Sequence, residues 1–190
     1  MKRLIDSYCG YLKNQGIITE TQVEVCSYGL ELFVSGVLNI GIVLCISLIL
    51  GQGTEAVLFL IGFIPLRLFA GGYHADTHFH CCIIFSGLYL LSTLLNLIHD
   101  TVTLGMFVVV EMIIIYLLAP VPSPDKPISE RRRKKNRKIS ICIVLFNICI
   151  YMMFLLGERS SLLSVPYFIG GFLASCTLIA GRIKANLTVH

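Results

Sequence analysis

Long uncharged hydrophobic runs, separated by short polar segments, dominate the chain. The run from Leu32 to Leu50 contains no charged residue. At about 1.5 Å per residue, a helix of that length crosses a hydrocarbon layer of about 30 Å. Four later runs are of similar length, namely residues 81–98, 101–119, 139–156 and 162–180. This pattern predicts helices that span a membrane.

A shorter hydrophobic run, Ala56 to Leu66, does not reach the length of a span by itself. It becomes long enough only if residues 68–70 continue the helix and the side chain of Arg67 extends toward the membrane surface. We therefore expect this second span to be short or irregular, and we expect six spans in total.

Residues 1–29 mix hydrophobic residues with Lys, Asp and Glu. The mixture predicts two short amphipathic helices at the membrane surface before the first span. Thr19 and Gln22 have the spacing of a capping box, in which a hydroxyl and an amide satisfy free backbone groups at a helix start. We expect the second of these helices to begin there.

The overall composition supports a membrane protein. The chain of 190 residues is 56% hydrophobic and 14% charged, whereas soluble domains carry about 25% charged residues. Most soluble folds are thereby excluded, and we expect an all-α, polytopic fold in which residues 1–190 form one integral-membrane domain. Because several of the eight cysteines lie inside hydrophobic runs, we expect all eight to be reduced.

The positive charges indicate the orientation. Residues 120–138 combine a proline-rich stretch with a polybasic run, residues 131–138, and we expect a cytoplasmic loop there. If both termini are cytoplasmic, every lysine and arginine except Arg159 lies on the cytoplasmic side, as the positive-inside tendency requires. Because the polybasic run borders a membrane helix, anionic lipid headgroups explain it better than nucleic acid does.

Reactive side chains are densest in residues 67–82. This segment holds three of the five histidines and two adjacent cysteines, and its candidates for chemistry are Arg67, His74, Asp76, His78, His80, Cys81 and Cys82. Gly71 and Gly72 permit a sharp turn or a close approach of substrate backbone. An arginine at membrane depth is costly, so we expect Arg67 to have an anionic partner on the chain, a lipid or a substrate.

One interpretation of this segment is a cysteine nucleophile with a histidine base. Local spacing favours His78 with Cys81 or Cys82, three or four residues apart on a helix. His74 and Cys81 share a helical face, but an unbroken helix separates them by about 10 Å. If His74 is the base, the chain around Asp76 and Thr77 must be bent or non-helical.

Two other interpretations stay open on spacing alone. The histidines, the cysteines and Asp76 are all competent metal ligands, although no His-Glu-x-x-His or Cys-x-x-Cys pattern is present. Alternatively, the histidines tolerate the headgroup region and the cysteines fill space, without any chemistry.

The pattern Arg67-x-x-x-Gly71-Gly72-x-His74-Ala75-x-x-x-x-x-Cys81, followed by Pro-x-x-x-Lys-Pro-Ile at 122–128, resembles the accessory gene regulator protein B (AgrB) family of Gram-positive bacteria. The resemblance implies a multi-pass cysteine endopeptidase of the bacterial cell membrane. Its expected substrate is an AgrD-like quorum-sensing propeptide. It implies Cys81 as the nucleophile and His74 as the general base and acid, and Arg67 and Gly72 match positions that the family needs.

The implied reaction proceeds through an acyl-thioester on Cys81, from which the propeptide cyclises to a thiolactone or lactone without metal or nucleotide. A homodimer is also implied by the resemblance. Two carboxylates have open roles: Asp76 is a candidate to orient His74, and Glu111 lies in the middle of a span, as a functional group or as a polar contact within a bundle or dimer. The alternative from another class is a membrane component that binds or exports peptide without cleaving it.

Overall fold

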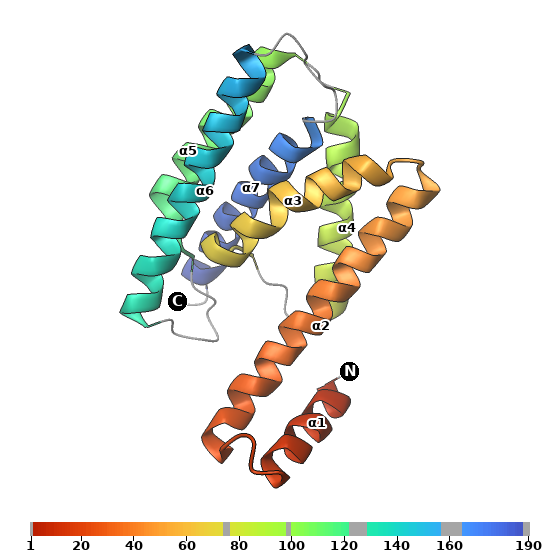
Figure 1. Cartoon of the computed structure of the whole chain (residues 1–190), viewed down its shortest axis with the longest axis vertical. Coiled ribbons are helices and arrows are strands. Elements are labelled where there is room, and N and C mark those ends of the chain that lie inside the picture. The colour runs from red at the N-terminus through yellow and green to blue at the C-terminus, as the bar shows by residue number, and fades with distance from the viewer. Residues whose placement is uncertain (1, 74–76, 98–99, 122–128, 157–164, 188–190) are drawn as a thin grey trace. The chain divides into compact units, whose positions relative to one another are not determined.

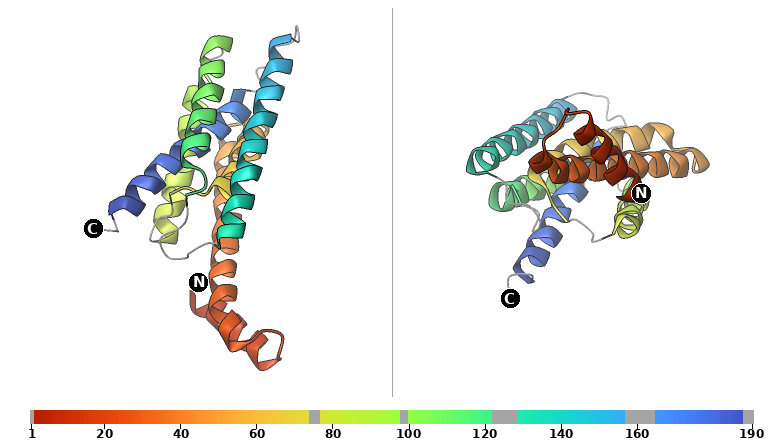
Figure 2. Two further views of the ribbon diagram at one scale, coloured as in Figure 1. Left: turned by 90° about the vertical axis from the view of Figure 1, so that its left-hand side faces the viewer. Right: turned by 90° about the horizontal axis from the view of Figure 1, so that it is seen from below.

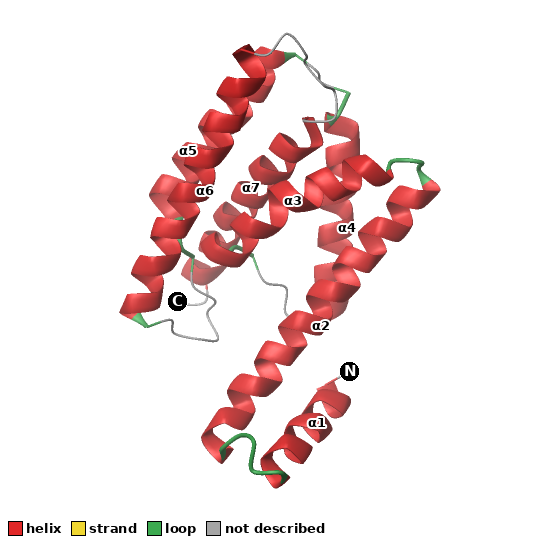
Figure 3. Cartoon of the chain, in the orientation of Figure 1, coloured by secondary structure: helices red, strands yellow, loops and turns green. Residues whose placement is uncertain are grey.

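A computed structural model describes residues 2–73, 77–97, 100–121, 129–156 and 165–187. The described chain is almost entirely helical (Figures 1 and 3). Its helices are α1 (Lys2–Asn14), α2 (Glu20–Ile49), α3 (Gly53–Ala70), α4 (His78–Leu95), α5 (Thr101–Leu118), α6 (Glu130–Leu156) and α7 (Val165–Leu187). Within these ranges the only β-type pairing is an isolated parallel bridge between Gly71 and Val121. The all-α prediction is confirmed.

Within the described residues, each of the six predicted hydrophobic runs lies mostly in a helix. Among the described residues, five helices are long and apolar enough to cross a membrane, namely α2, α3, α5, α6 and α7. The apolar stretch of α4, Phe79–Leu95, is shorter. As predicted for the second span, α3 continues past Arg67 to Ala70, and it contains a proline at position 65.

The N-terminal unit, residues 1–42, differs from the prediction in one respect. We predict a separate second amphipathic helix, but the helix that begins at Glu20 continues without interruption to Ile49. Residues 20–49 contain no proline and no glycine with a positive φ angle, so nothing ends the helix. The predicted cap is present in part, because the backbone N–H of Thr19 donates to Gln22 Oε1 at 2.9 Å.

The polybasic run is helical and does not form a loop. Helix α6 begins at Glu130, so residues 131–138 form its first turns and continue directly into the hydrophobic span. Arginine and lysine are good helix formers, and Glu130 is well placed at the positive end of the helix. The proline-rich residues 122–128 lie outside the described residues.

The C-terminal unit, residues 43–190, is organised around α7. Helix α7 packs against α3, α4 and α5, and α6 packs beside α5 (Figures 1 and 2). Where α3 crosses α7, glycines bring the two backbones into contact: a Cβ added to Gly62 would lie 2.1 Å from the carbonyl oxygen of Tyr167. Small residues commonly allow this close approach between membrane helices.

The N-terminus of α5 is defined by a side-chain cap. The Asp100 carboxylate accepts a hydrogen bond from the backbone N–H of Thr103 at 2.8 Å. Hydrogen bonds from the Thr103 hydroxyl and from this N–H lower the pKa of the Asp100 carboxyl. The cap therefore fixes where α5 begins after the short connection from α4, of which residues 98 and 99 lie outside the described residues.

Candidate active site

The candidate site begins at the C-terminal end of α3, where two glycines turn the chain. Gly71 has φ 83° and Gly72 has φ 132°, angles that residues with a Cβ rarely adopt. A Cβ on Gly71 would lie 2.4 Å from the carbonyl oxygen of Val121, and one on Gly72 would lie 2.2 Å from Arg67 Nη1. The predicted sharp turn is confirmed, and the close contacts that it makes are with the chain's own backbone and with Arg67.

Arg67 holds the turn from the last turn of α3. Its Nη1 donates to the carbonyl oxygen of Gly71 at 3.2 Å, and its Nη2 donates to the carbonyl oxygen of Tyr73. Its guanidinium is half-buried and forms no salt bridge with a carboxylate of the described residues. The partners seen for Arg67 are therefore two backbone carbonyls, and it spans the turn that leads to position 74.

Two distant segments support the other side of the turn. The backbone N–H of Tyr73 donates to the carbonyl oxygen of Thr177 on α7 at 2.9 Å, and that of Val121 donates to the carbonyl oxygen of Ala70 at 2.9 Å. A Cβ on Gly181 of α7 would lie 2.7 Å from the carbonyl carbon of Gly72, so α7 lies directly against the turn. Both backbone polar groups of Tyr73 are thus engaged.

Cys81 lies in the first turns of α4, whose N-cap is Thr77. Thr77 has an extended backbone (φ −128°, ψ 147°), and its hydroxyl oxygen accepts a hydrogen bond from the backbone N–H of His80 at 3.3 Å. The thiol of Cys81 is half-buried and interacts electrostatically with the Arg67 guanidinium. The structure therefore brings Arg67, the glycine turn and Cys81 into one region.

Not all of the candidate histidines lie within the described residues. His74 and Asp76 lie outside the described residues, as does the side chain of His78. The helix break that His74 requires is present on both sides of the gap, because Gly71–Tyr73 and Thr77 are non-helical. His80 is exposed, and its Nδ1 lies 2.8 Å from the Thr77 hydroxyl, which orients the ring at the start of α4.

The cysteines and the candidate metal ligands were also compared with the structure. All eight cysteines are free thiols in the structure, and their reduced state stays a prediction. Among the described residues, no three His, Cys, Asp or Glu side chains are grouped as metal ligands. Sequence reasoning did not find Thr177, Gly181 or Val121, because these residues support the turn through backbone groups or by lacking a side chain.

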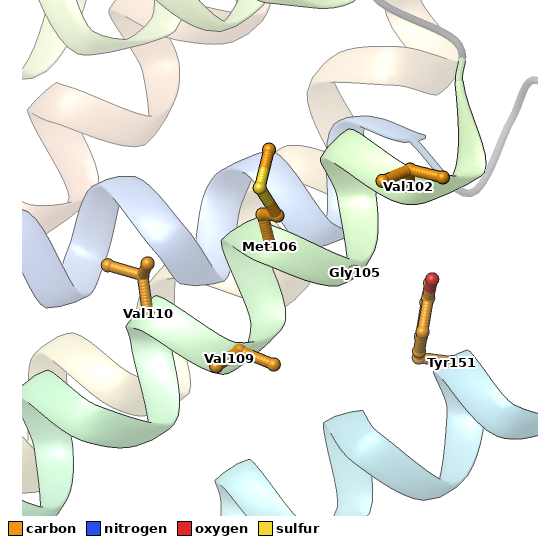
Figure 4. A pocket seen from close by; sticks show the side chains of 6 residues that line it. All are labelled: Val102, Gly105, Met106, Val109, Val110 and Tyr151. Atoms are coloured by element: carbon orange, nitrogen blue, oxygen red, sulfur yellow. The ribbon is translucent and has the colours of Figure 1, made fainter.

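An apolar groove elsewhere in the C-terminal unit offers no reactive group. It lies at α5 and Tyr151 of α6 (Figure 4), and it is lined by Val102, Gly105, Met106, Val109, Val110 and Tyr151. The Tyr151 hydroxyl donates to the carbonyl oxygen of Thr101 at 2.8 Å. The groove is therefore a separate feature from the site around Cys81.

Comparison with known proteins finds relatives whose sequences match most of the chain's length. The family model described as Accessory gene regulator B matches residues 5–179. Accessory gene regulator protein B of Staphylococcus aureus strain MW2 is 28% identical over 152 residues, which cover 78% of this chain and 81% of that protein. The protein of the same name from strain MRSA252 is 27% identical over the same length. No solved structure matches the chain.

Proposed function

The chain belongs to the accessory gene regulator B family, and we propose that it is a membrane cysteine endopeptidase that processes the propeptide of a quorum-sensing signal. The observation that carries this proposal is the placement of Cys81 beside Arg67, next to a turn whose backbone is held on both sides. The nearby guanidinium and the fixed turn would hold a peptide carbonyl and the Cys81 sulfur in one place.

In the proposed reaction, His74 takes the proton of the Cys81 thiol and the thiolate attacks a peptide carbonyl of the propeptide. The C–N bond then breaks, and the imidazolium returns its proton to the departing amine. This step releases a C-terminal fragment and leaves the N-terminal part as an acyl-thioester on Cys81. A side-chain thiol or hydroxyl of the propeptide next gives its proton to His74 and attacks the thioester, which closes a thiolactone or lactone ring and frees the Cys81 thiolate; the imidazolium then returns the proton to Cys81.

Arg67 supports this chemistry as a positioning residue. By binding the carbonyl oxygens of Gly71 and Tyr73, it fixes the backbone immediately before His74. The carbonyl oxygen of Thr177 holds Tyr73 from the other side by accepting its backbone N–H. Reaction rates depend steeply on such positioning, since a small misplacement of a catalytic group lowers them by large factors. Its charge also lies near the sulfur that must become anionic.

The setting of the site favours cyclisation over hydrolysis. A thioester exchanged for a thiolactone is close to isoenergetic, so water must be kept from the intermediate. We propose that both termini are cytoplasmic, that the site faces the inner leaflet, and that a propeptide with an amphipathic helix reaches it along this surface. A homodimer is part of the same proposal, as is contact with anionic lipid headgroups.

The decisive experiment detects the intermediate. The full-length protein is reconstituted in lipid nanodiscs with a cognate propeptide, quenched in acid and measured as intact mass. We expect an added mass equal to the N-terminal part of the propeptide, absent in Cys81→Ala and retained in Cys82→Ala. Cleavage that survives in Cys81→Ala contradicts the proposal.

Two further arms of this experiment separate the alternative functions. A component that only binds or exports peptide would retain propeptide on both variants without producing any fragment. A metal-dependent protease would lose cleavage when a chelator is added and would recover it when the metal is returned. Under the thiol mechanism, a chelator leaves cleavage unchanged and alkylation of Cys81 abolishes it.

A further inference from the structure

A second polar cluster lies inside the C-terminal unit, where α5, α6 and α7 come together. The side chain of Glu111 on α5 is fully buried, with 0% of its surface exposed. Its Oε1 accepts a hydrogen bond from Asn147 Nδ2 on α6 at 2.7 Å. Asn147 Oδ1 in turn accepts a hydrogen bond from the Tyr167 hydroxyl on α7. This chain of hydrogen bonds connects three membrane helices.

The second carboxylate oxygen of Glu111 differs from the first. Among the described residues, no hydrogen-bond donor is paired with Oε2. The backbone of α7 closes the space beside it, since a Cβ added to Gly171 would lie 2.7 Å from Oε2. Of the described groups on neighbouring helices that face this carboxyl, Asn147 and Tyr167 are polar, and neither is cationic.

A negative charge at this position would be isolated in the interior of a membrane protein. Such a charge is costly unless a cation or several hydrogen bonds compensate it. A metal ion does not fit, because it needs several oxygen ligands and space around them, whereas Asn147 presents its amide N–H group and Gly171 closes the other side. A proton needs neither a cavity nor additional ligands.

From this geometry we propose that Glu111 is an intramembrane proton-binding site that is occupied at neutral pH. The proposal goes beyond the peptidase reaction and does not depend on it. Helix α7 connects the polar cluster around Glu111 with the glycine turn of the candidate active site. Gly171, which lies against Glu111, and Thr177, which holds Tyr73, are six residues apart, or about 9 Å along the helix.

Loss of the proton places a charge directly against the backbone of α7 at Gly171. The packing of α7 is then weakened, and with it the support that Thr177 and Gly181 give to the turn before His74. Proton occupancy at Glu111 therefore stabilises the scaffold of the candidate active site.

Infrared spectroscopy of the full-length protein in nanodiscs tests the protonation directly. A protonated carboxylic acid has a carbonyl-stretch band that an ionised carboxylate lacks. We expect this band at pH 7 in the wild type and in the control Glu55→Gln, which alters a half-buried glutamate in the first turn of α3. We expect its loss in Glu111→Gln. If the infrared absorption of protonated carboxylic acids at pH 7 is the same in Glu111→Gln as in the wild type, the proposal is overturned.

Two further measurements keep the proposal falsifiable. If Glu111→Gln does not fold, wild type with ¹³C-labelled glutamate is measured instead, and the absence of any shifted protonated-acid band overturns the proposal. If the variant folds, hydrogen exchange at the Tyr73 amide is compared between pH 7 and pH 9.5. We expect protection to fall more in the wild type than in Glu111→Gln. An equal change in both proteins overturns the link through α7.

Discussion

The guanidinium of Arg67 donates a hydrogen bond to the carbonyl oxygen of Tyr73, the residue directly before His74. It also donates to the carbonyl oxygen of Gly71 at 3.2 Å. One side chain thus binds the carbonyl oxygens of two residues, Gly71 and Tyr73, that are separated by a single residue. A planar group with several N–H donors is well suited to this geometry. The relationship explains why an arginine stands near the end of a membrane helix without a carboxylate partner among the described residues.

Replacement of Arg67 by lysine tests this role. Lysine keeps the charge but does not donate to both carbonyls in the same geometry, and a lost hydrogen bond from a charged donor costs about 1.5–3 kcal/mol. If that energy is needed in the transition state, kcat/KM for propeptide cleavage falls by about 10- to 100-fold. Cleavage kinetics in nanodiscs measure the effect, and the exposed Arg182 on α7 supplies the matched control Arg182→Lys. Equal rates in the two variants would show that the two-carbonyl contact is dispensable.

Gly72→Ala tests the turn itself. Alanine would have to adopt φ near 132°, a strained conformation that costs on the order of 1–3 kcal/mol. Its Cβ would also lie 2.2 Å from Arg67 Nη1, so we expect a lower thermal unfolding midpoint and a loss of cleavage. Gly87→Ala is the control: it lies in α4 with nothing within 4 Å of the new Cβ. There we expect no loss of stability, because alanine favours a helix over glycine by about 0.5–1 kcal/mol. A Gly72→Ala protein as stable and active as Gly87→Ala would contradict the described turn.

Thr77 determines where the helix that carries Cys81 begins. Removing its hydroxyl in Thr77→Ala deletes the N-cap hydrogen bond to the His80 N–H, which typically costs about 1 kcal/mol. It also removes the hydroxyl that lies against His80 Nδ1. We expect lower stability and slower cleavage, and we expect Thr77→Ser, which retains the hydroxyl, to restore most of both. The fraction unfolded against temperature and the initial cleavage rate are the measurements. Identical behaviour of the alanine and serine variants would exclude the cap as the reason.

Hydrophobic runs predict the helices of this fold well, because a segment that crosses lipid must satisfy its backbone hydrogen bonds internally. Helix boundaries are less predictable: α2 and α6 both extend into polar sequence, since charge alone does not end a helix. In the site, the adjacent glycines Gly71 and Gly72 predict a turn. The contribution of Thr177 and Gly181 comes from a helix about 100 residues later in the chain and from backbone atoms, which have no local sequence signal. Glu111 stands out as a charge within a span, but its partner Asn147 is identified only by the packing of α5 against α6.

The polybasic start of α6 provides the last prediction. Residues 131–133 are exposed arginines on a helix that continues into the membrane span. We propose that they attract a propeptide segment that carries negative charge. Replacing all three by glutamine removes three charges while retaining the helix, because arginine and glutamine have similar helix propensities. Exposed charges are screened over about 10 Å at 0.1 M salt. We therefore expect slower propeptide processing than in the wild type at low salt and a difference that shrinks as salt rises. The initial cleavage rate, measured in nanodiscs of neutral lipid across a salt series, separates attraction of the propeptide from binding of anionic lipid. A variant that processes propeptide at the wild-type rate at low salt would exclude a role for this cluster in substrate capture.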